Sequence, residues 1–123
     1  MGAVTAHEVL YDEVVTASEE LQRLVQKPIR HFAFPYGQHV NLNPMAFDLA
    51  YKSGFHSVSS AYGGFNFPGD DAFHLQRIPV DNDMIRLKNW VTIDPRKITK
   101  TVRYRYEHSD APYSHERTAT NER

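Results

Sequence analysis

The stretch Ile29-Arg30-His31-Phe32-Ala33-Phe34-Pro35-Tyr36-Gly37 decides how the rest of the sequence is interpreted, because it is an apolar run that stops at a Pro-Tyr-Gly turn. A continuous rather than alternating apolar run suits a strand buried on both faces, as in a parallel sheet. Pro35 cannot donate a ladder hydrogen bond and Gly37 permits unusual backbone angles, so we expect the strand to end here. The carboxyl ends of parallel strands are where α/β folds build their sites. The simpler interpretation, one more core strand followed by its turn, stays open at this point.

One helix is predicted on each side of this strand. Asp12 is a candidate N-cap for the first helix, and Pro28 ends it. Its apolar side chains recur at helical spacing and belong to Val14, Val15, Leu21, Leu24 and Val25. Asn43-Pro44 marks the start of the second helix, because asparagine caps free backbone N–H groups and proline at the first helical position loses no hydrogen bond. Gly54 provides the left-handed stop of that helix.

Two more strands and a third helix are expected downstream. Residues 55–61 and 73–80 are predicted strands, and the glycine-rich segment 62–71 between them is a predicted loop. Asp83 can cap a short helix from Met84 to about Val91, whose apolar contacts would be Ile85, Leu87 and Trp90. The order helix, strand, helix, strand, strand, helix predicts an α/β domain with at least one parallel crossover.

The last part of the sequence is poor in apolar residues. From Asp94-Pro95 onward, charged residues, Ser, Thr and His surround only Ile98, Val102 and a few tyrosines. Such a segment buries too little apolar surface to offset the entropy lost when it is ordered. We therefore expect one domain at residues 1–97 and a flexible, polar and basic tail at residues 98–123.

Composition limits the class of protein. A chain of 123 residues forms one domain at most, and its 41% hydrophobic and 24% charged residues are ordinary for a soluble globular protein. No window approaches the ~20 apolar residues of a membrane span, and no signal peptide is visible. We expect a cytoplasmic location and no membrane span, unless an export signal was lost upstream. With no cysteine, His, Asp and Glu are the candidate metal ligands.

The charge of the chain argues against one class of partner. A net charge of −1 gives no reason to expect nucleic acid. Tyr104-Arg105-Tyr106 alternates aromatic and basic residues as single-strand binders do, but a pattern of three residues is too short to change this expectation.

Phe32-Ala33-Phe34-Pro35-Tyr36-Gly37 resembles the FAYPYG-type motif of polysaccharide deacetylases, the NodB-homology or family 4 carbohydrate esterases. The resemblance extends from Ser18 to Arg30 upstream, recurs at residues 50–55 and 73–80, and covers roughly residues 5–95. It implies the C-terminal portion of a NodB-like (β/α) barrel that lacks its N-terminal strands. The complete domain would hydrolyse the C–N bond of N-acetyl amino sugars in a polysaccharide or oligosaccharide. The alternative from another class is a catalytically inactive carbohydrate-binding or interaction module.

The resemblance also implies a divalent metal, most often zinc, held in the complete domain by an Asp and two His. His7 matches the second histidine of the pair. Ala3 stands where the first should be, and the family's paired aspartates would lie before the start of this chain. One imidazole makes a poor metal site, so we expect no tight binding by this chain alone. The alternative for His7 is a solvated side chain near the terminus.

Around the strand end, the resemblance assigns a catalytic role to Tyr36. Its backbone N–H, which follows the motif proline, would donate to the oxyanion formed on the acetyl group. The alternative is a tyrosine ring that packs at the strand end. The candidates for substrate binding are Pro35, His74 and Arg77. For Arg77, a surface ion pair with Asp81 or Asp83 is the alternative.

Overall fold

The centre of the fold is a three-stranded parallel sheet. The computed structural model describes residues 2–3, 5–78, 82–100 and 103–106, with strands β1 (His31–Ala33), β2 (Ser57–Ser60) and β3 (His74–Gln76). They lie in the order β1-β2-β3, with Phe32 opposite Val58 and Val58 opposite His74. The predicted α/β class and parallel crossover are confirmed. The strands are shorter than predicted, since β2 and β3 omit residues 55–56, 61, 73 and 77–78, although Phe34, His56 and Arg77 still donate backbone hydrogen bonds to the neighbouring strand or to the residue just before it. Residues 79–80 of the last predicted strand lie outside the described residues.

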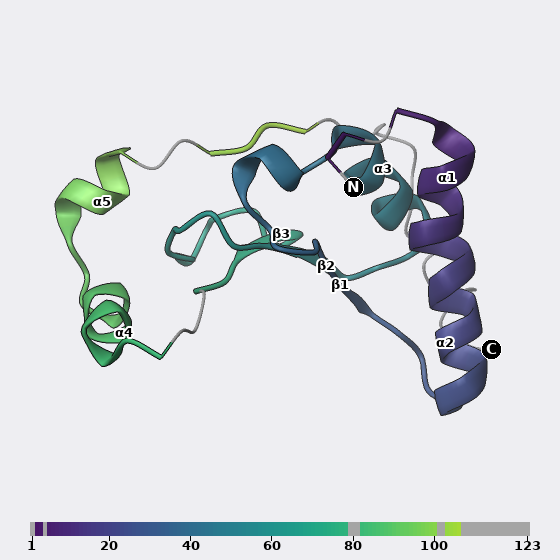
Figure 1. Ribbon diagram of the computed structural model, residues 1–123, viewed down its shortest axis with the longest axis horizontal. Coiled ribbons are helices and arrows are strands. Elements are labelled where there is room, and N and C mark those ends of the chain that lie inside the picture. Colours follow the sequence, from purple (N-terminus) through teal and green to yellow (C-terminus); the bar gives the residue numbers. More distant parts are fainter. Residues whose placement is uncertain (1, 4, 79–81, 101–102, 107–123) are drawn as a thin grey trace.

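A long helical run precedes β1. Helix α1 (His7–Tyr11), the π-helical turn η1 (Asp12–Thr16) and helix α2 (Ala17–Val25) follow one another without a break (Figure 1). Asp12 was predicted to cap this helix, and that prediction is wrong, because the N-cap position is Ala6. Alanine offers no side-chain acceptor, so the sequence carries no capping signal at the true start. The run ends at Gln26, which adopts a left-handed φ of 54° just before Pro28.

Only the first half of this helical run contributes to the core. Leu10, Val14 and Val15 are buried and face helix α3 (Pro44–Lys52). Leu21, Leu24 and Val25 were predicted to lie on the same buried side, yet all three are exposed, Leu24 by 70%. In the π-helical turn η1, each backbone hydrogen bond spans one residue more than in an α-helix. The side chains after η1 are therefore rotated about the helix axis, and the apolar ones among them face away from the core.

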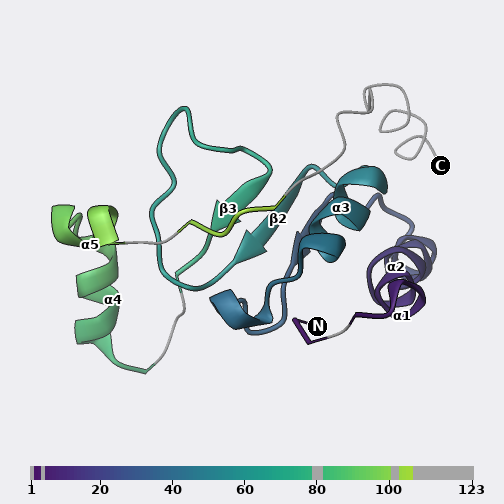
Figure 2. The same cartoon turned by 90° about the horizontal axis from the view of Figure 1, so that it is seen from above.

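Helix α3 covers one face of the sheet, as Figures 1 and 2 show. It begins as predicted, since the Asn43 side chain accepts hydrogen bonds from the backbone N–H of Met45 at 2.9 Å and of Ala46 at 3.4 Å. It ends at the predicted Gly54, whose φ is 82°. Packing between α3, α1, η1 and the sheet buries the apolar side chains of Phe34, Phe47, Leu10, Val14 and Val58 almost completely.

Helices α4 (Met84–Val91) and α5 (Pro95–Lys100) lie at the opposite end of the molecule from α1 (Figure 1). The side chain of Asp83 accepts from the Ile85 N–H at 2.9 Å, which confirms the predicted start of α4. Ile85 was predicted to be an apolar contact, but it is 69% exposed. Trp90, by contrast, makes the predicted apolar contact. Its ring lies against Gly63, and a Cβ added to Gly63 would overlap the ring.

The segment 103–106 crosses the same face of the sheet as α3 (Figure 2). Tyr104 and Tyr106 stack on Phe47, with ring centroids 5.5 and 4.2 Å away. A flexible tail was predicted from residue 98, and for residues 103–106 that prediction is wrong, because aromatic stacking supplies contact area that a count of aliphatic residues misses. Residues 107–123 of the predicted tail lie outside the described residues.

None of the described helices has both the length and the apolar character needed to cross a bilayer.

Candidate functional site

The two faces of the sheet differ in what covers them. Side chains alternate along each strand, so Phe32, Val58 and His74 share the face that packs under α3. The other face carries Ala33 and Leu75, which are both exposed. Within the described part of the chain, no helix or strand lies over that second face, as Figure 1 shows. The carboxyl ends of the strands therefore border an open surface on one side.

At the end of β1, the chain makes the predicted Pro-Tyr-Gly turn. The Gly37 N–H donates to the Pro35 carbonyl at 2.6 Å, and the Gly37 carbonyl accepts from the Ala61 N–H at 2.6 Å. Tyr36 and Gly37 both have left-handed φ values, 60° and 70°. A Cβ on Gly37 would lie 2.7 Å from the Ala61 nitrogen, so only glycine fits beside β2. The turn is thus joined to the end of the neighbouring strand.

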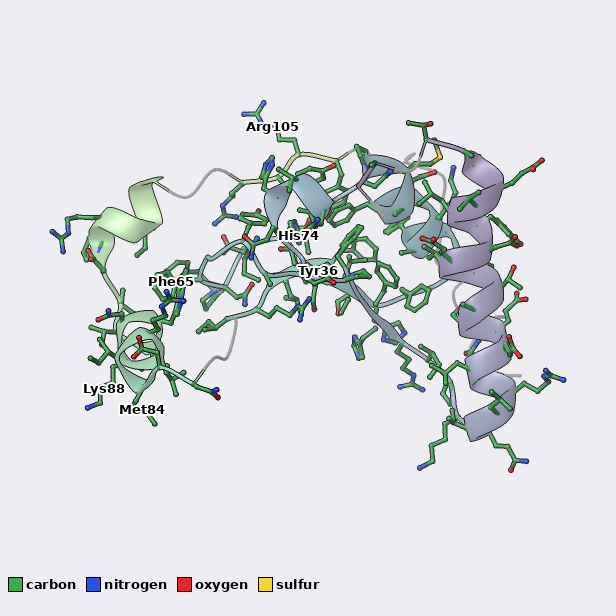
Figure 3. All side chains as sticks on the ribbon, viewed as in Figure 1. Tyr36, Phe65, His74, Met84, Lys88 and Arg105 are labelled. Carbon is green, nitrogen blue, oxygen red and sulfur yellow. The ribbon has the colours of Figure 1, made fainter. Side chains whose placement is uncertain are left out.

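Tyr36 is exposed at this turn. Its side chain is 85% exposed and lies beside the sheet (Figure 3), so the alternative of a packed ring is wrong. Among the described residues, the backbone N–H of Tyr36 has no hydrogen-bond partner. A left-handed φ costs a non-glycine residue about 1–2 kcal/mol, and such strain tends to be kept where a site needs it. The geometry offers one free, oriented donor at the carboxyl edge of a parallel sheet.

Arg77 fixes the position of this turn through hydrogen bonds to the backbone. Its Nη2 donates to the Phe34 carbonyl at 2.7 Å, and its backbone N–H donates to the Ser60 carbonyl at 2.9 Å. The alternative partner Asp83 pairs with Arg86 at 3.9 Å, and Asp81 lies outside the described residues. Arg77 is therefore a positioning residue for the turn, while its contact with a substrate stays a prediction.

His74 lies on the covered face, away from the open one. Its Nε2 is 2.7 Å from the Ser60 hydroxyl, which is 3.2 Å from Oε1 of Gln76. The imidazole also packs against the rings of Phe47 and Tyr106. Burial lowers the pKa of His74, an effect that the Asp71 carboxylate opposes and Arg103 reinforces. The imidazole is therefore held neutral in a packed network, apart from the Tyr36 turn.

His7 is not brought near the turn. It is the first residue of α1, is exposed, and stacks on Tyr11 with ring centroids 6.3 Å apart. The hollow that it lines runs between α1, α2 and α3 and does not include Tyr36. In the residues that the structure describes, there is no group of three or more His, Asp or Glu arranged to hold a metal ion. The predicted site residues thus lie in three separate places.

Several well-placed polar residues were missed by sequence reasoning. Ser60, Gln76 and Arg103 surround His74, and nothing in their spacing predicts this, because they come from two strands and the late segment 103–106. The alternation of tyrosine and arginine in that segment predicts only that Tyr104 and Tyr106 share one side, and both rings do lie on Phe47.

Comparisons of this chain with protein-family models, with curated proteins and with solved structures found no match.

Proposed function

We propose that this chain forms part of a polysaccharide deacetylase domain of the NodB type, which removes acetyl groups from N-acetyl amino sugars. The observation that supports it is the free backbone N–H of Tyr36 at the carboxyl edge of the parallel sheet. Sites of α/β proteins form at this edge. The same turn carries the Phe-Pro-Tyr-Gly sequence on which the resemblance rests.

The proposed reaction uses this donor in its first step. Water adds to the acetyl carbonyl carbon and gives a proton to a general base of the complete domain, and the carbonyl oxygen becomes an oxyanion. The Tyr36 N–H donates to that oxyanion, and such a donor lowers the barrier because the charge exists only in the transition state and intermediate. The C–N bond then breaks, the sugar amine leaves with a proton, and acetate is released. Arg77 contributes by holding the Phe34 carbonyl, and with it the turn.

The open face of the sheet supports a larger domain. In a (β/α) barrel the inner face of each strand contacts other strands, whereas helices cover the outer face. Helix α3 covers the face that would be the outer one, and the exposed Ala33 and Leu75 lie on the other. Strands β1 and β3 are both at sheet edges, where further strands could pair. We propose that the additional strands complete a barrel of this kind.

The metal that the resemblance implies does not fit the described residues. His7 is separated from the turn, and the described part of the chain provides no group of three ligands. In a complete domain a divalent metal, most often zinc, would polarise the acetyl carbonyl and activate the water. We therefore derive no step of the reaction through a metal held by these residues.

The missing ligand group favours a second candidate function. A catalytically inactive carbohydrate-binding or interaction module needs no metal and no general base. It shares the turn and the open face with the first proposal but predicts binding without hydrolysis.

Acetate release separates the two functions. The longest natural protein that contains these residues is incubated with chitin oligosaccharides and zinc ions, and acetate is measured with time. The deacetylase proposal predicts acetate release that stops when a chelator is added and returns when zinc is restored. Saturable binding of the oligosaccharide with no acetate release would reject it in favour of the inactive module.

A further inference from the structure

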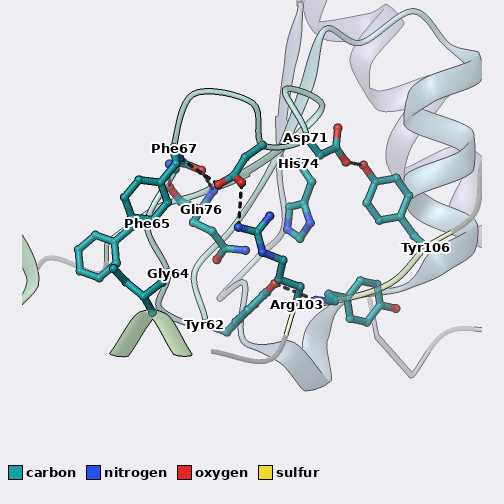
Figure 4. Close-up of a pocket in the computed structure, with 13 residues that line it drawn as sticks. Tyr62, Gly64, Phe65, Phe67, Asp71, His74, Gln76, Arg103 and Tyr106 are labelled. Carbon is teal, nitrogen blue, oxygen red and sulfur yellow. Dashed lines mark hydrogen bonds and ion pairs between the residues drawn. The ribbon is translucent and has the colours of Figure 1, made fainter. Parts of the chain in front are cut away.

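A second hollow lies on the covered side of the sheet, away from the Tyr36 turn. It has a volume of about 110 Å³ and is enclosed by the loop 62–71, strand β3 and the segment 103–106 (Figure 4). Its wall combines aromatic rings, such as Tyr62 and Phe65, with the polar side chains of His74, Gln76 and Arg103. Nothing in the proposed deacetylation uses these groups.

The wall of this hollow is held in place by specific hydrogen bonds. The Asn66 side chain donates to the Gln76 carbonyl at 2.7 Å and accepts from the Gln76 N–H at 2.8 Å, which fixes the loop to β3. On the other side, the Tyr104 N–H donates to the Tyr62 hydroxyl at 3.0 Å. The two sides are thus tied to the sheet and to each other, so the hollow is a formed feature of the fold rather than a gap beside a loose loop.

The charges around the hollow disfavour an anion. Arg103 forms an ion pair with Asp70 at 2.9 Å, so these two charges compensate each other. The second carboxylate at the hollow, that of Asp71, accepts a hydrogen bond from the Tyr106 hydroxyl. Because the imidazole of His74 is neutral, the hollow carries about one net negative charge.

The free hydrogen-bonding groups of the hollow include both a donor and an acceptor. Ser60 donates its only proton to Gln76, so it must accept from His74 Nε2–H, which leaves Nδ1 of His74 as an acceptor. Within the described residues, that Nδ1 and the side-chain amide protons of Gln76 have no partner. A ligand that carries a hydrogen-bond donor and a hydrogen-bond acceptor on neighbouring atoms would satisfy both side chains.

We propose that this hollow binds a single sugar ring. Neighbouring sugar hydroxyls both donate and accept, carry no charge, and stand beside C–H surfaces that pack on aromatic rings such as Phe65. The volume corresponds to about four water molecules at ~30 Å³ each, so the hollow takes one ring with part of it in solvent. The proposal does not rest on the deacetylase function, because it needs neither Tyr36 nor a metal.

Titration of the full chain with glucose and, separately, with N-acetylglucosamine tests this site by nuclear magnetic resonance. We expect saturable shifts of the Gln76 side-chain amide and the Gly64 N–H, with a Kd in the range of about 1–10 mM that is usual for a small neutral ligand with few contacts. Phe65→Ala should weaken binding at least tenfold, and Phe65→Tyr should retain it. Tyr11→Ala removes an exposed aromatic ring elsewhere and should leave binding unchanged.

If Phe65→Ala does not fold, Gly64→Ala replaces it, because the added Cβ would lie 3.0 Å from Cγ of Gln76 and move that side chain within the hollow. Absence of saturation by both sugars up to roughly 50 mM, well above the Kd range for such ligands, would overturn the proposal. So would equal binding by the parent and by a folded Phe65→Ala variant, or a stronger response to acetate than to either sugar. Since binding is read without acetate release, failure here is distinguishable from failure of the deacetylase function.

Discussion

Replacement of Tyr106 measures how much the segment 103–106 contributes to folding. The Tyr106 ring stacks on Phe47 with centroids 4.2 Å apart and planes 13° apart, and its hydroxyl donates to Asp71. An aromatic pair contributes about 0.5–1.5 kcal/mol beyond its buried area, and burial of half of such a ring contributes about 1 kcal/mol more. The hydrogen bond adds about 1 kcal/mol. We therefore expect Tyr106→Ala to lower the free energy of unfolding by about 3 kcal/mol and Tyr106→Phe by about 1 kcal/mol.

Urea unfolding followed by circular dichroism measures both changes as shifts of the midpoint at constant slope. Arg105→Ala is the matched control, because this neighbouring side chain points away from the sheet (Figure 3) and is exposed. It should change the free energy of unfolding by less than about 0.5 kcal/mol. If Tyr106→Ala destabilises the protein no more than Arg105→Ala does, the segment is not packed on Phe47 and the account of residues 103–106 is wrong.

Three further predictions use the same unfolding assay. Asn43→Ala removes the acceptor for two N–H groups at the start of α3 and should cost about 1 kcal/mol, and an unchanged midpoint would contradict the capping geometry. Tyr36→Gly relieves a left-handed φ of 60° and should stabilise the protein by up to about 1 kcal/mol after the entropy cost of glycine, whereas Tyr36→Pro should destabilise it. Burial lowers the pKa of His74 below 6.5, so just below that pH the unfolded chain binds more protons than the folded chain does. The stability that the buried, neutral imidazole contributes is therefore present above pH 6.5 and is lost as the pH falls. A His74→Gln variant should lose less stability than the parent between about pH 8 and about pH 5, and equal losses would contradict the buried, neutral imidazole.

Local capping signals predicted helices α3 and α4 well. Asn43-Pro44 and Asp83 provide a side-chain oxygen at the N-cap, and each caps the predicted helix in the structure. The first helix lacks such a signal, because Ala6 precedes it and the acidic Asp12 lies inside it. A helix start without a polar cap is set by packing of residues such as Leu10 on the core, which no local pattern reveals.

The candidate site was predictable only in part. The end of β1 at Pro35 and the exposed turn follow from residue types, since proline ends the ladder and glycine accepts the left-handed region. The left-handed φ of Tyr36 and the bond from Arg77 to Phe34 could not be predicted, because they depend on the tertiary approach of segments 43 residues apart in the chain. The place of His74 likewise depends on Tyr106, which sequence analysis had assigned to a flexible tail.

The most direct test of the central claim removes the N–H of Tyr36 without changing its backbone angle. Semisynthesis replaces Tyr36 by its α-hydroxy acid, which turns the peptide bond into an ester, in the longest natural protein that contains these residues. Proline cannot serve here, because its φ near −65° is incompatible with the observed 60°. For a variant that melts near the parent temperature, we predict a kcat for acetate release from chitin oligosaccharides that is lower by roughly a hundredfold or more, with Tyr36→Phe close to the parent. Parental kcat in the folded ester variant would contradict the oxyanion role of this turn.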